Sequence, residues 1–176
     1  SGCGKTTTAL SMLRKGAFLL GDDLILLEID DDGVNATGFP EMMNLTEQTI
    51  TFFEELQHTQ SSLSKGLGSH KKIISPYDVY GQSCMVEKSK IEVIYFVNVC
   101  GDKPSVRKLS FGGAVGKLLH SHTFANNQKI TNFEFNRLSD VLGQINAYTL
   151  QTGNCPEYIG EWLIRHCAEH VAQRMI

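Results

Sequence analysis

The chain opens on a glycine-rich turn that leads directly into a helical pattern, and this junction constrains the fold more than any other feature. Residues 1–8 read Ser-Gly-Cys-Gly-Lys-Thr-Thr-Thr, and apolar residues at helical spacing follow as far as Gly16. Gly2 and Gly4 allow a tight turn whose backbone N–H groups can point at an anion, and a helix N-terminus adds partial positive charge there. We therefore expect an anion-binding turn at the start of a helix over residues 5–15.

These letters match the second half of the P-loop pattern, Gly-x-x-x-x-Gly-Lys-Ser/Thr. In that pattern backbone amides hold the phosphates, the lysine contacts the β- and γ-phosphates, and the next hydroxyl binds Mg²⁺. The first glycine of the pattern and the strand before it would lie ahead of the first residue. The sequence therefore predicts a nucleotide-phosphate site formed by Ser1, Gly2, Cys3, Gly4, Lys5, Thr6 and Thr7.

A pair of aspartates, Asp22 and Asp23, follows the helix after a short apolar run at residues 17–20. Such a run predicts a buried strand in a parallel sheet. A helical crossover would return this strand parallel to the one before the turn, so that the aspartates open on the same sheet edge. Phosphoryl transfer needs a carboxylate for the metal and often a base for the attacking hydroxyl. We expect Asp22 to be the base, Thr6 and Asp23 to hold Mg²⁺, and Lys5 to stabilise charge on the phosphates.

The first forty or so residues resemble the HPr serine kinase/phosphorylase family and its HPr-kinase-like relatives, through the motifs at residues 1–6 and 13–23. The shared features are the turn, the helix, the basic residue before Gly16, the apolar strand and the double aspartate, without a gap. A looser resemblance covers residues 135–164. The resemblance implies a phosphoenolpyruvate carboxykinase-type P-loop fold, ATP and Mg²⁺ as cofactors, and functional roles for Gly4, Lys5, Thr6, Asp22 and Asp23. Residues 38–43 lack the Glu-Ile-Arg-Gly type segment of true HPr kinases, so a kinase-like relative acting on another hydroxyl fits better.

Together these features predict an ATP- and Mg²⁺-dependent phosphotransferase that moves the γ-phosphate to a hydroxyl. The expected acceptor is a serine of a protein or peptide. Three alternatives stay open: a small-metabolite kinase, a P-loop ATPase, and a nucleotide-binding regulatory module without kinase activity.

Two further groups of side chains have competing interpretations. Lys71 and Lys72 could reach the phosphates or the acceptor, but solvated lysines at a strand edge are equally common. Residues 166–170 match the His-x-x-Glu-His metalloprotease pattern, which a polar helix face explains better.

Composition narrows the class of partners. The 176 residues are 41% hydrophobic and 20% charged, which suits one globular domain with a core. The net charge of −3 favours neither nucleic acid nor an anionic membrane as partner, and the apolar runs are too short to span a bilayer. The five cysteines form no Cys-x-x-Cys pair, which favours reduced thiols in the cytoplasm. A homo-oligomer stays open.

The remaining pattern predicts one α/β domain over residues 1–176, with a mixed sheet flanked by helices. Strands are expected at residues 24–29, 34–37, 71–75, 84–86, 90–100, 106–111 and 147–150. The first two should form a hairpin, and residues 106–111 should pair with 90–100. Residues 60–69 are expected to be a mobile loop. Helices are expected at residues 45–58, capped by Asn44 or Thr46, and at 113–122, 133–145 and 156–175.

Overall fold

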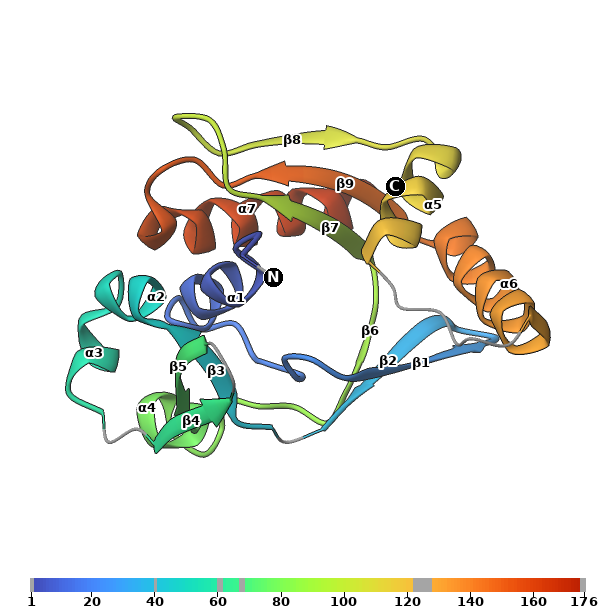
Figure 1. Ribbon diagram of the computed structural model, residues 1–176. Coiled ribbons are helices and arrows are strands. Elements are labelled where there is room, and N and C mark those ends of the chain that lie inside the picture. The colour runs from blue at the N-terminus through green and yellow to red at the C-terminus, as the bar shows by residue number, and fades with distance from the viewer. Residues whose placement is uncertain (1, 40, 60–61, 67–68, 122–127, 175–176) are drawn as a thin grey trace.

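The computed structural model describes residues 2–39, 41–59, 62–66, 69–121 and 128–174. Within these ranges the strands form three sheets of three strands each, and helices lie between and around them (Figure 1). The protein is therefore mixed α/β, as the sequence predicts. The prediction of one mixed sheet is only partly met, because one of the three sheets is mixed and the other two are antiparallel.

The mixed sheet has the order β7-β9-β8, with β7 at Val93–Asn98, β8 at Ser105–Lys108 and β9 at Asn146–Gln151. β7 runs parallel to β9, and β8 runs antiparallel to it. The predicted pairing of residues 106–111 with residues 90–100 is therefore wrong, because β9 lies between them. Four consecutive residues of β9 are buried whereas β8 is mostly exposed, which is the pattern of a central strand beside an edge strand.

A second sheet contains the predicted hairpin. β1 (Ile25–Asp30) pairs antiparallel with β2 (Gly33–Gly38), and β6 (Lys88–Lys90) adds to the other edge of β2. Alternate residues of β2 are buried, as expected for a strand with one face on a core.

The third sheet has the order β3-β5-β4, with β3 at Met43–Thr46, β4 at Ser62–Gly66 and β5 at Ser69–Ile74. The predicted strand at residues 71–75 is confirmed. The predicted loop over residues 60–69 is wrong where it is described, because β4 pairs antiparallel with β5. Residues 62–66 are a strand because their backbone pairs with the edge of β5. Their side chains show no alternation of apolar and polar residues from which a strand could be predicted. Residues 60, 61, 67 and 68 of that prediction lie outside the described residues.

The helix predicted at residues 45–58 is only partly right. β3 occupies its start, and two short helices follow, α2 at Glu47–Thr51 and α3 at Glu54–Gln57. The chain is extended at Phe53, whose side chain is fully buried, so that burial of this ring separates the two helices. The predicted cap at Thr46 is confirmed, because its hydroxyl accepts a hydrogen bond from the Thr49 N–H at 3.1 Å.

Residues 17–20 do not form the predicted strand. Their sheet pairing is a single parallel bridge between Leu19 and Met85, which is also the pairing found within residues 84–86. Leu19 is buried, but Phe18 beside it is 64% exposed. The apolar run at residues 17–20 therefore buries the Leu19 side chain but is not a strand covered on both faces.

The helices predicted in the second half of the chain are present. They are α5 (Phe111–Ser121), α6 (Gln128–Gln144) and α7 (Pro156–Arg174). The short helix α4 (Pro76–Tyr80) follows β5. Positions 122 and 175 of the predictions lie outside the described residues. No described helix combines the length and the apolar character needed to cross a membrane.

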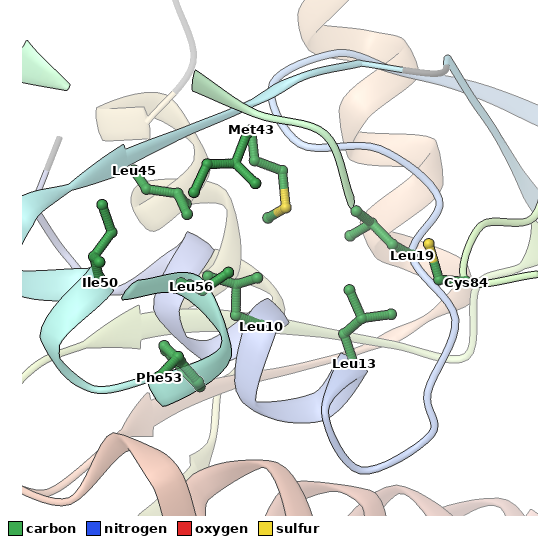
Figure 2. Close-up of a cluster of buried hydrophobic side chains, with 10 residues drawn as sticks. Leu10, Leu13, Leu19, Met43, Leu45, Ile50, Phe53, Leu56 and Cys84 are labelled. Atoms are coloured by element: carbon green, nitrogen blue, oxygen red, sulfur yellow. The ribbon is translucent and has the colours of Figure 1, made fainter. Parts of the chain in front are cut away.

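Helix α1 (Lys5–Leu13) lies between α7 and the β3-β5-β4 sheet (Figure 1). One side of α1 contributes Leu10 and Leu13 to a buried cluster shared with β3, α2 and α3 (Figure 2). The other members of this cluster are Leu19, Met43, Leu45, Ile50, Phe53, Leu56, Ile74 and Cys84.

The contact between α1 and α7 is a close approach of two backbones. The Gly160 N–H of α7 donates to the Ser11 hydroxyl at 2.8 Å, and both residues are buried. A Cβ atom on Gly160 would overlap the backbone carbonyl of Ser11 and lie 2.7 Å from the Met12 nitrogen. Glycine is therefore needed at this position to let the helices meet.

We predict that Gly160→Ala lowers the free energy of unfolding by roughly 2–3 kcal/mol, because the two helix backbones must separate. Gly143→Ala is the matched control: Gly143 is also helical, and a Cβ there meets no atom within 4 Å. This control should gain about 0.5–1 kcal/mol from helix propensity. Urea unfolding of both variants tests the contact, and equal stability of the two would contradict it.

Candidate functional site

A cavity of about 520 Å³ lies at the N-terminus of α1. Its floor is the N-terminal turn (residues 2–4) together with the first turn of α1. One wall combines the Asp22-Asp23 pair with residues of β3, α2 and β5, and the opposite wall is formed where β7 and β9 end. The cavity therefore gathers segments from the first to the last quarter of the chain.

The N-terminal turn packs tightly against the end of β7. Gly4 has φ +87°, which glycine adopts without strain, and a Cβ atom there would lie 2.6 Å from the Val99 Cγ2. Gly2 also has a positive φ of +86°. Both predicted glycines thus have the conformations that a tight turn requires. Ser1 lies outside the described residues.

Lys5 and Cys3 face each other across the turn. The Lys5 Nζ lies 3.3 Å from the Cys3 Sγ, and the Lys5 side chain is exposed to the cavity. Partial burial raises the pKa of the Cys3 thiol, but hydrogen bonding and charge from Lys5 outweigh burial, so that the pKa is lowered. The Lys5 Nζ therefore lies at the cavity, in contact with the Cys3 thiol.

The structure brings the predicted threonine and the predicted aspartates together. The Thr6 hydroxyl donates to the Asp22 Oδ1 at 3.3 Å, across sixteen positions of sequence. Asp23 also lines the cavity, is exposed, and donates its backbone N–H to the Glu41 Oε2 at 3.2 Å. Asp22, and not Asp23, is therefore the carboxylate in contact with Thr6.

The electrostatic surroundings of Asp22 oppose its ionisation. Burial and the negative charge of Asp23 raise the pKa of the Asp22 carboxyl above its ordinary value, with a smaller contribution from Glu41. Hydrogen bonds from Thr6 and from the backbone of Asn44 partly offset this rise. Asp22 is thus a carboxyl group whose proton affinity is increased by its site.

A chain of three hydroxyl groups connects α1 to α2. The Thr7 Oγ1 lies 3.1 Å from the Thr49 Oγ1, which lies 2.9 Å from the Thr46 Oγ1. All three residues line the cavity. This chain attaches the first turn of α1 to the wall formed by β3 and α2.

The wall at the ends of β7 and β9 was missed by sequence reasoning. Val99 follows β7, and residues 152–154 follow β9. The Thr152 and Gly153 N–H groups donate to the carbonyls of Asn98 and Cys100, at 3.1 and 3.2 Å, which joins the two strand ends. Ligands bind outside the carboxyl ends of parallel strands. The signal was available in the strand patterns at residues 90–100 and 147–150, but only once their parallel pairing is known.

The lysine pair and the His-x-x-Glu-His residues named in the sequence analysis differ in their relation to the cavity. Lys71 lines the cavity, and Lys72 does not. Of the His-x-x-Glu-His residues, His166 is engaged elsewhere: its Nδ1 lies 2.7 Å from the Tyr95 hydroxyl, and its ring stacks on Trp162, which is half-buried beside the core of α7. The side chain of His170 lies outside the described residues.

The donor set at the cavity suits Mg²⁺ better than a transition metal. The described residues contain no group of three or more His, Cys, Asp or Glu side chains that could hold a metal ion. Mg²⁺ commonly takes only one or two protein carboxylates and completes its shell with waters and substrate phosphates. The hydroxyl oxygen of Thr6 and the carboxylates of Asp22 and Asp23 are hard oxygen donors of that kind.

Comparison with known proteins adds no family: no family model, no curated protein and no solved structure matches the chain significantly. The resemblance to HPr-kinase-like proteins therefore stays a prediction, which depends on the N-terminal residues described above.

We predict that Cys3 is alkylated faster in the native protein than in Lys5→Met, because the variant loses the cation that stabilises the thiolate. At pH 7 the iodoacetamide rate at Cys3 should fall by roughly three-fold or more. Cys155, which is exposed and outside the cavity, serves as the internal standard in the same mass-spectrometric experiment. An unchanged ratio of the two rates would argue against the Lys5–Cys3 contact.

Proposed function

We propose that the cavity binds ATP with Mg²⁺ and transfers the γ-phosphate to a hydroxyl group, with a serine of a protein or peptide as the preferred acceptor. The observation that carries this proposal is the 3.3 Å contact between Thr6 and Asp22. It unites two separate sequence signals, the turn before a helix and the double aspartate, in one cavity. A glycine turn that served only as a structural cap would not require a carboxylate pair beside its threonine.

The residues of the floor have a defined part in this proposal. The N–H groups of the N-terminal turn and of the first turn of α1 lack helical partners and would donate to phosphate oxygens. Lys5 would neutralise charge on the β- and γ-phosphates. The exposure of Lys5 to the cavity is compatible with that role.

The aspartates divide the remaining work. Asp22 would accept the proton of the acceptor hydroxyl. The oxygen of that hydroxyl would bond to the γ-phosphorus while the bond from the γ-phosphorus to the β-phosphate oxygen breaks, leaving ADP. Its raised pKa suits a base better than an ordinary surface carboxylate does. Thr6 and Asp23 would hold Mg²⁺, which when bound neutralises charge on the phosphates. The Thr6–Asp22 contact also fits an exchange of the two aspartate roles, and the variants described below distinguish these assignments.

We predict that Lys5→Ala weakens ATP binding at least roughly ten-fold and abolishes turnover, because a charge-assisted contact to phosphate is lost. Lys117→Ala on α5 is the control, since Lys117 is exposed and lies outside the cavity. Calorimetric titration with ATP·Mg²⁺ measures the first effect, and release of ADP the second. Normal binding and turnover in Lys5→Ala would refute the proposed site.

We predict different losses for the two aspartates. Asp22→Asn should keep ATP·Mg²⁺ affinity within a few-fold but lose roughly 10²–10⁴ of the transfer rate, as expected when a base is removed. Asp23→Asn should instead raise the Mg²⁺ concentration needed for half-maximal rate. In the native protein kcat/KM, which reports the unliganded protein, should fall at acidic pH as Asp22 is protonated, with an inflection above the ordinary aspartate value of 3.8 because burial and Asp23 raise the pKa.

Asp31→Asn is the control for both aspartate variants, because Asp31 lies in the exposed turn between β1 and β2. Transfer of radiolabel from ATP into cell-extract proteins or small molecules identifies the class of acceptor. Hydrolysis of ATP without any labelled acceptor, lost in Asp22→Asn, would favour the ATPase alternative. Binding of ATP without hydrolysis or transfer would favour a regulatory module.

A further inference from the structure

We propose that Lys71 of β5 is a second phosphate-binding cation, which contacts the terminal phosphate of the bound nucleotide from the wall opposite the β7 and β9 strand ends. This inference rests on the proposed function and adds a residue that the sequence motifs do not include. Among the described residues that line the cavity, the cationic side chains are Lys5 and Lys71. Lys5 enters from the floor and Lys71 from a wall.

The strand register directs Lys71 into the cavity. Lys71 is the antiparallel partner of Thr46, so the two side chains project from the same face of the sheet with Cβ atoms about 5 Å apart. Thr46 itself lines the cavity. Lys72 pairs with the fully buried Leu45 and projects from the opposite face, in agreement with its absence from the cavity lining.

β3 also connects Lys71 to the aspartates. Asn44 and Thr46 are two residues apart on β3 and therefore share a face, which is the face that lines the cavity. The backbone of Asn44 is hydrogen-bonded to Asp22, and Thr46 is the partner of Lys71. Asp22 and Lys71 thus both adjoin β3, Asp22 through the backbone of Asn44 and Lys71 across the pairing with Thr46. In the proposed function the γ-phosphate is the phosphate nearest Asp22, and we place it within reach of the Lys71 side chain, since both residues line the cavity.

The chain of three threonine hydroxyls fixes the distance between this wall and the first turn of α1. Thr46 reaches Thr7 of α1 through two hydroxyl contacts of 2.9 and 3.1 Å. Lys71 forms no ion pair with any carboxylate among the described residues. Its ammonium group is therefore a donor that an anionic ligand in the cavity can use.

The test compares binding of ADP with that of the non-hydrolysable β,γ-imido analogue of ATP, each with Mg²⁺, by calorimetry. Lys71→Met should weaken the ATP analogue by roughly ten-fold or more while ADP changes less than about two-fold. Lys71→Arg should keep most of the affinity because it keeps the charge. Lys72→Met is the matched control and should affect neither nucleotide. Lys71→Gln is a second neutral variant if Lys71→Met does not fold.

The possible results separate this inference from the proposed function. Failure of the native protein to bind either nucleotide would refute the proposed function itself. Binding by the native protein with an unchanged ratio of the two affinities in Lys71→Met or Lys71→Gln would refute the role of Lys71 alone. A selective loss for the ATP analogue, shared by both neutral variants and absent from Lys72→Met, supports it.

Discussion

The close approach of α1 to α7 is the constraint on which the cavity depends. Ser11 and Gly160 let two helix backbones meet with one hydrogen bond at the contact, and this fixes one side of α1. The cluster containing Leu10 and Leu13 fixes the other side (Figure 2). A helix held on both sides has little freedom to slide or rotate, because close-packed interiors tolerate small displacements poorly. The N-terminal turn is thereby held at the ends of β7 and β9.

The walls of the cavity come from elements that do not belong to one sheet. The β7-β9-β8 sheet supplies one wall through residues that follow its parallel pair, and the β3-β5-β4 sheet supplies the other. The α1 helix lies between the two and joins them (Figure 1). The site is therefore an interface between two small sheets, in which each contributes polar groups from its edge or its end.

The part of the site that is local in sequence could be predicted. Gly4, Lys5 and Thr6 are consecutive, and the spacing to Asp22 predicted a shared location that the Thr6–Asp22 contact confirms, although the strand expected at residues 17–20 does not form. The Thr46 cap is likewise a local hydrogen bond to Thr49. Each of these predictions required knowledge of one turn or one helix only.

The remainder depends on contacts that no local pattern contains. Val99 and Gly153 reach the cavity because β7 and β9 are parallel neighbours, so that their carboxyl ends lie side by side. This pairing joins segments that are far apart in the sequence. Residues 17–20 were misread because burial of Leu19 alone produces the same apolar letters as a strand buried on both faces. The helix predicted over residues 45–58 is only partly right, because Leu45 lies in β3, Ile50 in α2 and Leu56 in α3. The chain is extended between the two helices at the buried Phe53.

The three linked threonine hydroxyls have a consequence for the polarity of the cavity. Each hydroxyl both donates and accepts, and Thr46 already accepts the Thr49 N–H. The three protons can therefore rotate together, which reverses the direction of the whole chain while the oxygen atoms stay in place. Thr7 can present a proton to a negative group or a lone pair to a positive one. The wall between α1 and α2 thus keeps its geometry while the direction of its hydroxyl dipoles can reverse. Neighbouring hydroxyls strengthen either orientation by polarising one another.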